Sequence, residues 1–176
     1  ASWLATVDHK RIGILYIVTS LIFFLAGGVM ALLIRTQLAQ PDMDVVTKDS
    51  YNQLFTMHGT TMIFLVVVPI FAGFANFLVP LMIGARDVAF PRLNALSYWL
   101  FLFGGIVLLG SFFATEGAAR TGWTGYPPLS QQASGNGQDL WIVGLHILSL
   151  SSILGAINFL VTIHNMRRAG MTWMRL

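Results

Sequence analysis

The sequence predicts an all-α membrane protein with four transmembrane helices, and three observations carry that prediction. Hydrophobic residues make up 56% of the 176-residue chain and charged residues only 10%, well below the roughly 25% of soluble domains. The mean hydropathy is +0.72. The charges are also clustered, which leaves four uncharged stretches at 12–34, 50–85, 93–115 and 140–166. Each stretch reaches the roughly 20 residues that a helix needs to cross a hydrocarbon core.

The four helices follow from these stretches in order. The first is expected at about 12–35; it is too long for a signal peptide and lacks a small-residue cleavage pattern. The second is expected at about 51–84, bent at Pro69 and Pro80, because proline removes a backbone hydrogen bond and clashes with the preceding turn. The third is expected at about 92–113 and the fourth at about 140–166. Together they form a single transmembrane region over 1–176.

The basic residues predict a cytoplasmic N-terminus, because lysine and arginine are enriched in cytoplasmic loops. In that orientation the inner side carries Lys10, Arg11, Arg86, Arg92, Arg167, Arg168 and Arg175, and the outer side carries only Arg35, Lys48 and Arg120. The net charge of +3 gives no indication of a nucleic-acid partner. The absence of cysteine excludes disulfides and thiolate metal sites.

Two histidines lie about two turns below the outer surface, His58 in the second helix and His146 in the fourth. His58 could be a haem ligand, with Gly59 leaving room for a flat ring, or a core residue bonded to a backbone carbonyl. His146 could complete a two-histidine haem site with His58 or bond to a neighbour. Arg35 follows Gly28 and Ala31 on one helical stripe; it could clamp a planar group or extend to the interface.

A second polar group lies deeper and towards the inner side. On the fourth helix Ser151, Gly155, Asn158 and Thr162 form one continuous stripe, with Ser152 adjacent. Asn76, Asn94, Ser97 and Tyr16 come from the other helices, and Asp87 lies in the inner loop where these elements converge. Such residues could order a chain of waters for proton transfer, or they could form ordinary interhelical hydrogen bonds.

Several motifs, in order, resemble the first four helices of subunit I of haem–copper terminal oxidases, most closely the cytochrome c oxidase branch. The resemblance covers about residues 5–172 and is carried by DHKRIGILY, LLIRTQLAQP, YNQLFTMHGTTMIF, NFLVPLMIGARDVAFPRLNALSYWL, GWTGYPPLS and SSILGAINFLVTIHNMR. It implies the N-terminal third of a bundle of about twelve helices.

The resemblance implies a role for each matching residue. His58 would be one axial ligand of a low-spin haem, of type A in this branch. Arg35 would bond the haem's ring substituent, Met62 would pack on the haem, and Trp123 and Tyr126 would lie near the propionates of a second, high-spin haem. Asp87 would open the proton-uptake path, continued by Asn76, Asn94, Asn158, Ser151, Ser152 and Tyr16. His146 would then be structural.

The resemblance also implies the reaction and the partners. Electrons would pass from cytochrome c, through a copper-bearing subunit II, to the low-spin haem and then to a haem–copper centre that reduces O₂ to water while protons are translocated. The ligands of that centre would lie in the rest of subunit I, so this part alone would be inactive. Subunit III and the lipids of a prokaryotic inner membrane are further expected partners. Ala26, Met30 and Ser50 argue against quinol as the donor.

Two other functions remain open at this point. The chain could be a self-contained membrane cytochrome whose single haem is held by His58 and His146. It could also be a haem-free helical module, such as a channel or an assembly subunit.

Overall fold

The computed structural model describes residues 2–132 and 135–175, and its four long apolar helices confirm the predicted all-α membrane architecture. The first span is α1 (His9–Gln37). The second joins α2 (Lys48–Thr60), a π-helical segment η1 (Thr61–Val67) and α3 (Val68–Ile83). The third is α4 (Pro91–Gly110) followed by the 3₁₀ turn η2 (Ser111–Phe113). The fourth is α6 (Asn136–Asn165), and two short elements remain, α5 (Leu129–Gln132) and η3 (Trp173–Arg175).

The first two spans begin three residues before the predicted positions because polar residues cap them outside the apolar stretches. The Asp8 carboxylate accepts the backbone N–H groups of Lys10 and Arg11, 2.9 and 3.0 Å away, and Thr47 caps α2 by accepting from Ser50 N. The hydrogen bond from Arg11 N lowers the pKa of Asp8, against the opposing effect of partial burial. This stabilisation is complete above the usual carboxyl pKa and is lost as the pH falls through the lowered value.

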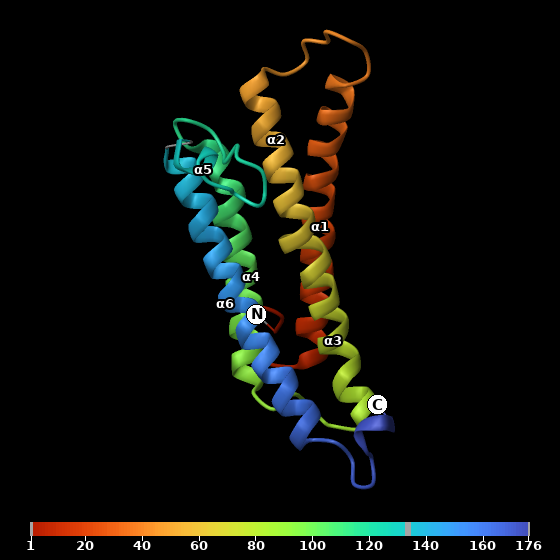
Figure 1. Cartoon of the computed structure of the whole chain (residues 1–176). Helices are drawn as coiled ribbons and strands as arrows, with labels where there is room; N and C mark the ends of the chain where they lie inside the picture. The colour runs from red at the N-terminus through yellow and green to blue at the C-terminus, as the bar shows by residue number, and fades with distance from the viewer. Residues whose placement is uncertain (1, 133–134, 176) are drawn as a thin grey trace.

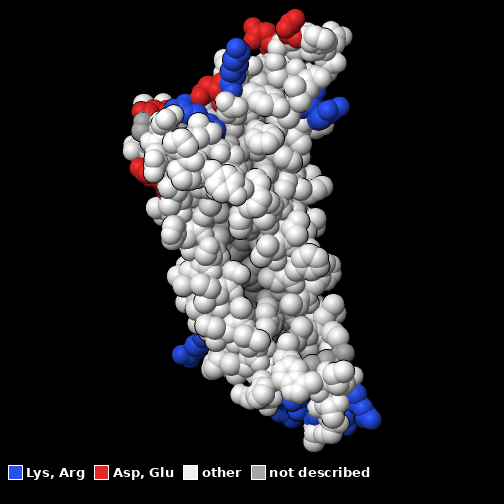
Figure 2. Space-filling view, in the orientation of Figure 1, with Lys and Arg blue, Asp and Glu red and all other residues white. Residues whose placement is uncertain are grey.

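The four spans form two antiparallel pairs (Figure 1), α1 with α2–η1–α3 and α4 with α6. The pairs meet chiefly where α1 contacts α4 and α3 contacts α6. The end of the bundle with the loop between α1 and α2 is called outer, following the orientation that the basic residues predict. In the view of Figure 1 the outer half of α2 stands apart from α4 and α6. Charged side chains gather at the two ends of the bundle, and the face between them in Figure 2 carries none. This is the distribution expected of a protein that spans a bilayer.

The second span changes its winding in front of Pro69. In the π-helical segment η1, a backbone N–H group bonds the carbonyl five residues earlier, where an α-helix would use the one four residues earlier. Val68 N, for example, bonds Ile63 O. Pro69 follows at once and has no N–H to continue a regular ladder. The helix therefore departs from regular α-helical geometry directly before Pro69, whereas Pro80 is accommodated inside α3 one turn before its end. Single π turns occur often at functional sites, and this one lies directly after the turn that carries His58.

The outer loop after η2 is fastened to α2 by side chains of that helix. The Gln53 side chain accepts from Ala118 N at 3.0 Å, and Arg120 forms an ion pair with Asp49 at 2.6 Å. One turn deeper, Thr56 accepts from Gly122 N at 2.9 Å. These contacts bring the loop across the gap between the two helix pairs and place its residues over the outer half of α2.

Glycine permits the close approach of α1 and α3, because a Cβ on Gly13 would lie 2.7 Å from the Gly73 carbonyl oxygen. We expect Gly13→Ala to lower the free energy of unfolding by about 1–3 kcal/mol, since a backbone atom must move. Titration with SDS in mixed micelles would measure this. Gly110→Ala is the control, because its Cβ would meet nothing within 4 Å. Equal effects of the two substitutions would contradict the proposed tight crossing.

Candidate functional site

The imidazole of His58 lies in the last turn of α2 and is oriented by α1. Its Nδ1 is 2.9 Å from the Gly27 carbonyl oxygen, on a residue 31 positions away. Because a carbonyl only accepts, Nδ1 carries the proton and Nε2 keeps its lone pair. No group in residues 2–132 or 135–175 hydrogen-bonds Nε2, and the ring is only half-buried. A metal-binding histidine is held in this way, with one nitrogen fixed and the other available.

Small residues and an arginine flank His58 on α1. Met62, one turn after His58, packs on Gly27 so closely that a Cβ there would lie 2.8 Å from the Met62 sulfur. A Cβ on Gly28 would meet no described atom within 4 Å. Arg35 lies two turns further out in the last turn of α1, is exposed, and makes no hydrogen bond within the described part of the chain. The open flank beside His58 is therefore on the α1 side.

The expectation that Gly59 leaves room for a flat ring is wrong. The indole of Trp123 occupies that space, 3.4 Å from where a Cβ of Gly59 would lie, and its ring centre is 6.2 Å from that of Phe64. The outer loop brings Trp123 there because Thr56 holds Gly122 next to it. Tyr126, three residues later in the same loop, remains 72% exposed.

His146 is not brought to His58. On α6, Trp141 faces α2, where its Nε1 donates to Thr60 Oγ1 at 3.0 Å. His146 follows five residues later, which turns it about 140° around the helix. It is exposed, and its Nδ1 bonds Ile142 O of its own helix at 2.8 Å. The alternative in which both histidines hold one haem is therefore not supported by their positions, and no cluster of three metal-ligating residues occurs in the described ranges.

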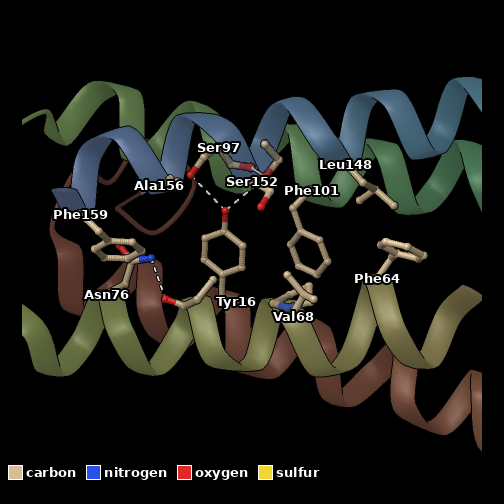
Figure 3. A pocket seen from close by; sticks show the side chains of 14 residues that line it. Tyr16, Phe64, Val68, Asn76, Ser97, Phe101, Leu148, Ser152, Ala156 and Phe159 are labelled. Carbon is tan, nitrogen blue, oxygen red and sulfur yellow. Dashed lines mark hydrogen bonds between the residues drawn. The ribbon is translucent and has the colours of Figure 1, made fainter.

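A cavity of about 190 Å³ lies between the helix pairs in the inner half of the bundle (Figure 3). Its polar lining comes from all four spans: Tyr16, Asn76, Ser97, Ser151 and Ser152. The Tyr16 hydroxyl lies 3.0 Å from Ser97 Oγ and 3.4 Å from Ser151 Oγ, and Ser151 donates to Ser97 O. Phe64, Val68 and Leu148 line its apolar part. These polar residues therefore converge on one cavity, as their positions in the sequence predict.

Three buried asparagines carry side-chain atoms without a partner among the described residues: Asn76 Oδ1, both atoms of Asn94, and Asn158 Nδ2. All three side chains are at most 2% exposed. Buried amide groups normally have hydrogen-bond partners, and ordered water is the usual one in a polar cavity. These orphaned atoms fit an internal chain of water molecules.

The predicted polar stripe on α6 divides into two parts. Ser151 lines the cavity, but Asn158 and Thr162 face the inner loop, where they accept from the backbone N–H groups of Phe90 and Ala89, each at 2.9 Å. Asp87 lies in that loop, half-buried, and its Oδ1 accepts from Val88 N. Neither Asn94 nor Asn158 lines the cavity. At its inner end the stripe therefore forms hydrogen bonds to another segment, one of the two roles considered for these residues.

His9 is a residue of this region that the sequence analysis did not identify. It is 2% exposed, and its Nδ1 lies 2.7 Å from the Asn76 carbonyl oxygen, which joins the start of α1 to α3. Its spacing could have revealed it, because Tyr16 follows seven residues later and two helical turns bring both onto one face.

Comparison with known proteins agrees with this geometry. The sequence profile of the family described as cytochrome c and quinol oxidase polypeptide I matches residues 11–176. The chain belongs to this family. It is 55% identical, over 99% of its length, to the putative cytochrome c oxidase subunit 1-beta of Streptomyces avermitilis, and 53% identical, over 99%, to the cytochrome c oxidase subunit 1 of Bacillus subtilis. A "heme-copper oxidase subunit I+III" of Aeropyrum pernix is 51% identical over 99% of the chain.

The chain spans less than a third of each of these relatives, 31%, 28% and 22% of their lengths. Membership in the oxidase polypeptide I family accounts for the multi-pass helical bundle. The family uses haem and copper. The residues around His58 fit a haem, because Nε2 of the half-buried imidazole has no hydrogen bond among the described residues and Gly28 on the neighbouring helix borders open space.

Proposed function

We propose that the chain is the N-terminal part of the catalytic subunit of a respiratory terminal oxidase. This subunit passes electrons from cytochrome c through a low-spin haem to a haem–copper centre, which reduces O₂ to water while protons are translocated. The single observation that carries the proposal is His58, whose Nδ1 is held by Gly27 O so that Nε2 is available. The ligands of the high-spin haem and copper belong to the rest of subunit I.

His58, Arg35 and Met62 are proposed to hold the low-spin haem, which would be haem A. His58 would supply one nitrogen ligand to its iron, and the hydrogen bond to Gly27 fixes the tautomer and the ring orientation of the imidazole. Arg35 would donate to the ring substituent and Met62 would pack against the ring. Trp123 and Tyr126, in the outer loop, would lie near the high-spin haem. When bound, the low-spin haem would supply one-electron transfer.

Asp87 is proposed as the entrance for protons, because it is a carboxylate of the inner loop below a polar cavity. From there the path runs past Asn94 and Asn158, whose free amide atoms fit bound water, to Asn76. It continues along the cavity wall through Tyr16, Ser97, Ser151 and Ser152. The amide and hydroxyl groups along this path can hold water by hydrogen bonds.

The proposed setting is a prokaryotic cell membrane with the N-terminus in the cytoplasm. Partners are the remainder of subunit I, the copper-bearing subunit II, subunit III, cytochrome c and the lipids. One relative's name joins subunits I and III, which supports a neighbouring subunit III.

The complete oxidase that contains this chain provides the test of the proposed function. In membranes it should consume O₂ with reduced cytochrome c as donor and acidify the outer side during turnover. A quinol should not replace cytochrome c. Rapid O₂ consumption with quinol alone would reject the proposed donor, and turnover without external acidification would reject the proton path.

A further inference from the structure

The inner loop between α3 and α4 is held at both ends by residues of the fourth span and its C-terminal extension. At its start, Gly84 ends α3 with a φ of 73°, and Arg168 N donates to the neighbouring Ile83 carbonyl at 3.0 Å. At its end, Phe90 N and Ala89 N donate to Asn158 and Thr162. The segment that carries Asp87 is therefore fixed from α6.

This attachment occupies the hydroxyl hydrogen of Thr162 and the side-chain oxygen of Asn158. Both residues are 0% exposed. The Thr162 hydroxyl donates to Asn158 O at 2.7 Å, and its oxygen accepts from Ala89 N at 2.9 Å. The side-chain oxygen of Asn158 accepts from Phe90 N, which leaves its Nδ2 free.

The backbone of the loop needs these two acceptors. The N–H groups of Ala89 and Phe90 have no other partner among the described residues, and Pro91, which begins α4, has no N–H. Loss of these hydrogen bonds would therefore destabilise this conformation of the loop. Asn158 and Thr162 thus hold, from a different helix, the two residues that lead into α4. Because Asp87 precedes Ala89 by two residues, this attachment restricts where its carboxylate can lie.

We infer that Asn158 and Thr162 are positioning residues, which fix the Asp87 loop against α6 and so set the place of proton uptake. The inference rests on the proposed function of Asp87. It gives Thr162, which the proposed path does not include, a defined role. It also changes the main task of Asn158 from ordering water to holding the loop.

The test uses the complete oxidase with Thr162→Val, which keeps the shape but removes the acceptor, and Thr162→Ser, which keeps the acceptor. Hydrogen–deuterium exchange of the peptide containing Ala89 and Phe90 should be about fivefold faster in the valine variant and unchanged in the serine variant. Asn158→Leu should accelerate the same peptide. The rate of proton uptake should fall about fivefold with valine and recover with serine, while the low-spin haem spectrum stays constant.

Two outcomes would overturn the inference. Unchanged exchange in both Thr162→Val and Asn158→Leu would mean that these side chains do not hold the loop. Faster exchange with normal proton uptake would mean that the loop's position does not matter for uptake. Failure of the proposed function is distinguishable, because it would leave the exchange results intact while Asp87→Asn took up protons normally.

Discussion

His58→Ala is expected to abolish the low-spin haem absorption of the complete oxidase. The substitution removes the nitrogen that the Gly27 carbonyl holds in place, and no other described histidine faces the same open flank of α1. Electron transfer from cytochrome c to the O₂-reducing centre should stop with it, because an axial ligand is lost. Optical spectra of the reduced and oxidised membranes, with haem quantified after extraction, would measure the loss.

His146→Ala is the matched control for this experiment. That imidazole is exposed on α6 and bonds only a carbonyl of its own helix, so its removal should leave the spectrum unchanged. Loss of the low-spin signal in His146→Ala would instead support the rival two-histidine cytochrome. Retention of the signal in His58→Ala would reject His58 as a haem ligand, and a normally assembled oxidase without any haem signal would favour a haem-free module.

Asp87→Asn is expected to slow the proton-limited steps of turnover on the order of 100-fold, at the lower end of what a positioned acid–base group contributes. The asparagine keeps the size and the acceptor for Val88 N but cannot bind and release a proton at neutral pH. The haem spectrum should not change, because the two residues are far apart along the second span. His58 lies in α2, whereas Asp87 lies in the loop that follows the opposite end of the span, after α3. Single-turnover proton uptake, followed with a pH-indicating dye, would measure the rate.

Asp139→Asn provides the comparison, since this exposed carboxylate lies in the first turn of α6, at the opposite end from Thr162. It removes one negative charge without touching the inner loop and should leave proton uptake unaltered. A normal rate in Asp87→Asn would remove the proposed entrance role. Equal slowing in both variants would indicate a general effect of charge on the membrane surface instead.

Several parts of the candidate site could be predicted from residue types and spacing, and others could not. The polar residues around Tyr16 were predicted to converge, and they do, because a helical repeat fixes which residues share a face. The orientation of Gly59 was predicted wrongly, because Trp123 arrives from a loop 64 positions away in the chain, through a hydrogen bond between Thr56 and Gly122. Long-range contacts of this kind have no signature in the local sequence.

The sequence by itself determined the four spans, their approximate ends and the depth of His58. A run of about 20 apolar residues is enough to predict a membrane-spanning helix, whichever helices pack against it. Only the tertiary structure decided which way each polar side chain faces. It turned His58 towards Gly27, left His146 outside, and committed Asn158 and Thr162 to the Asp87 loop. The physical reason is that a helix can rotate about its axis without changing its hydropathy, so packing against other helices and the pairing of buried donors select the rotation.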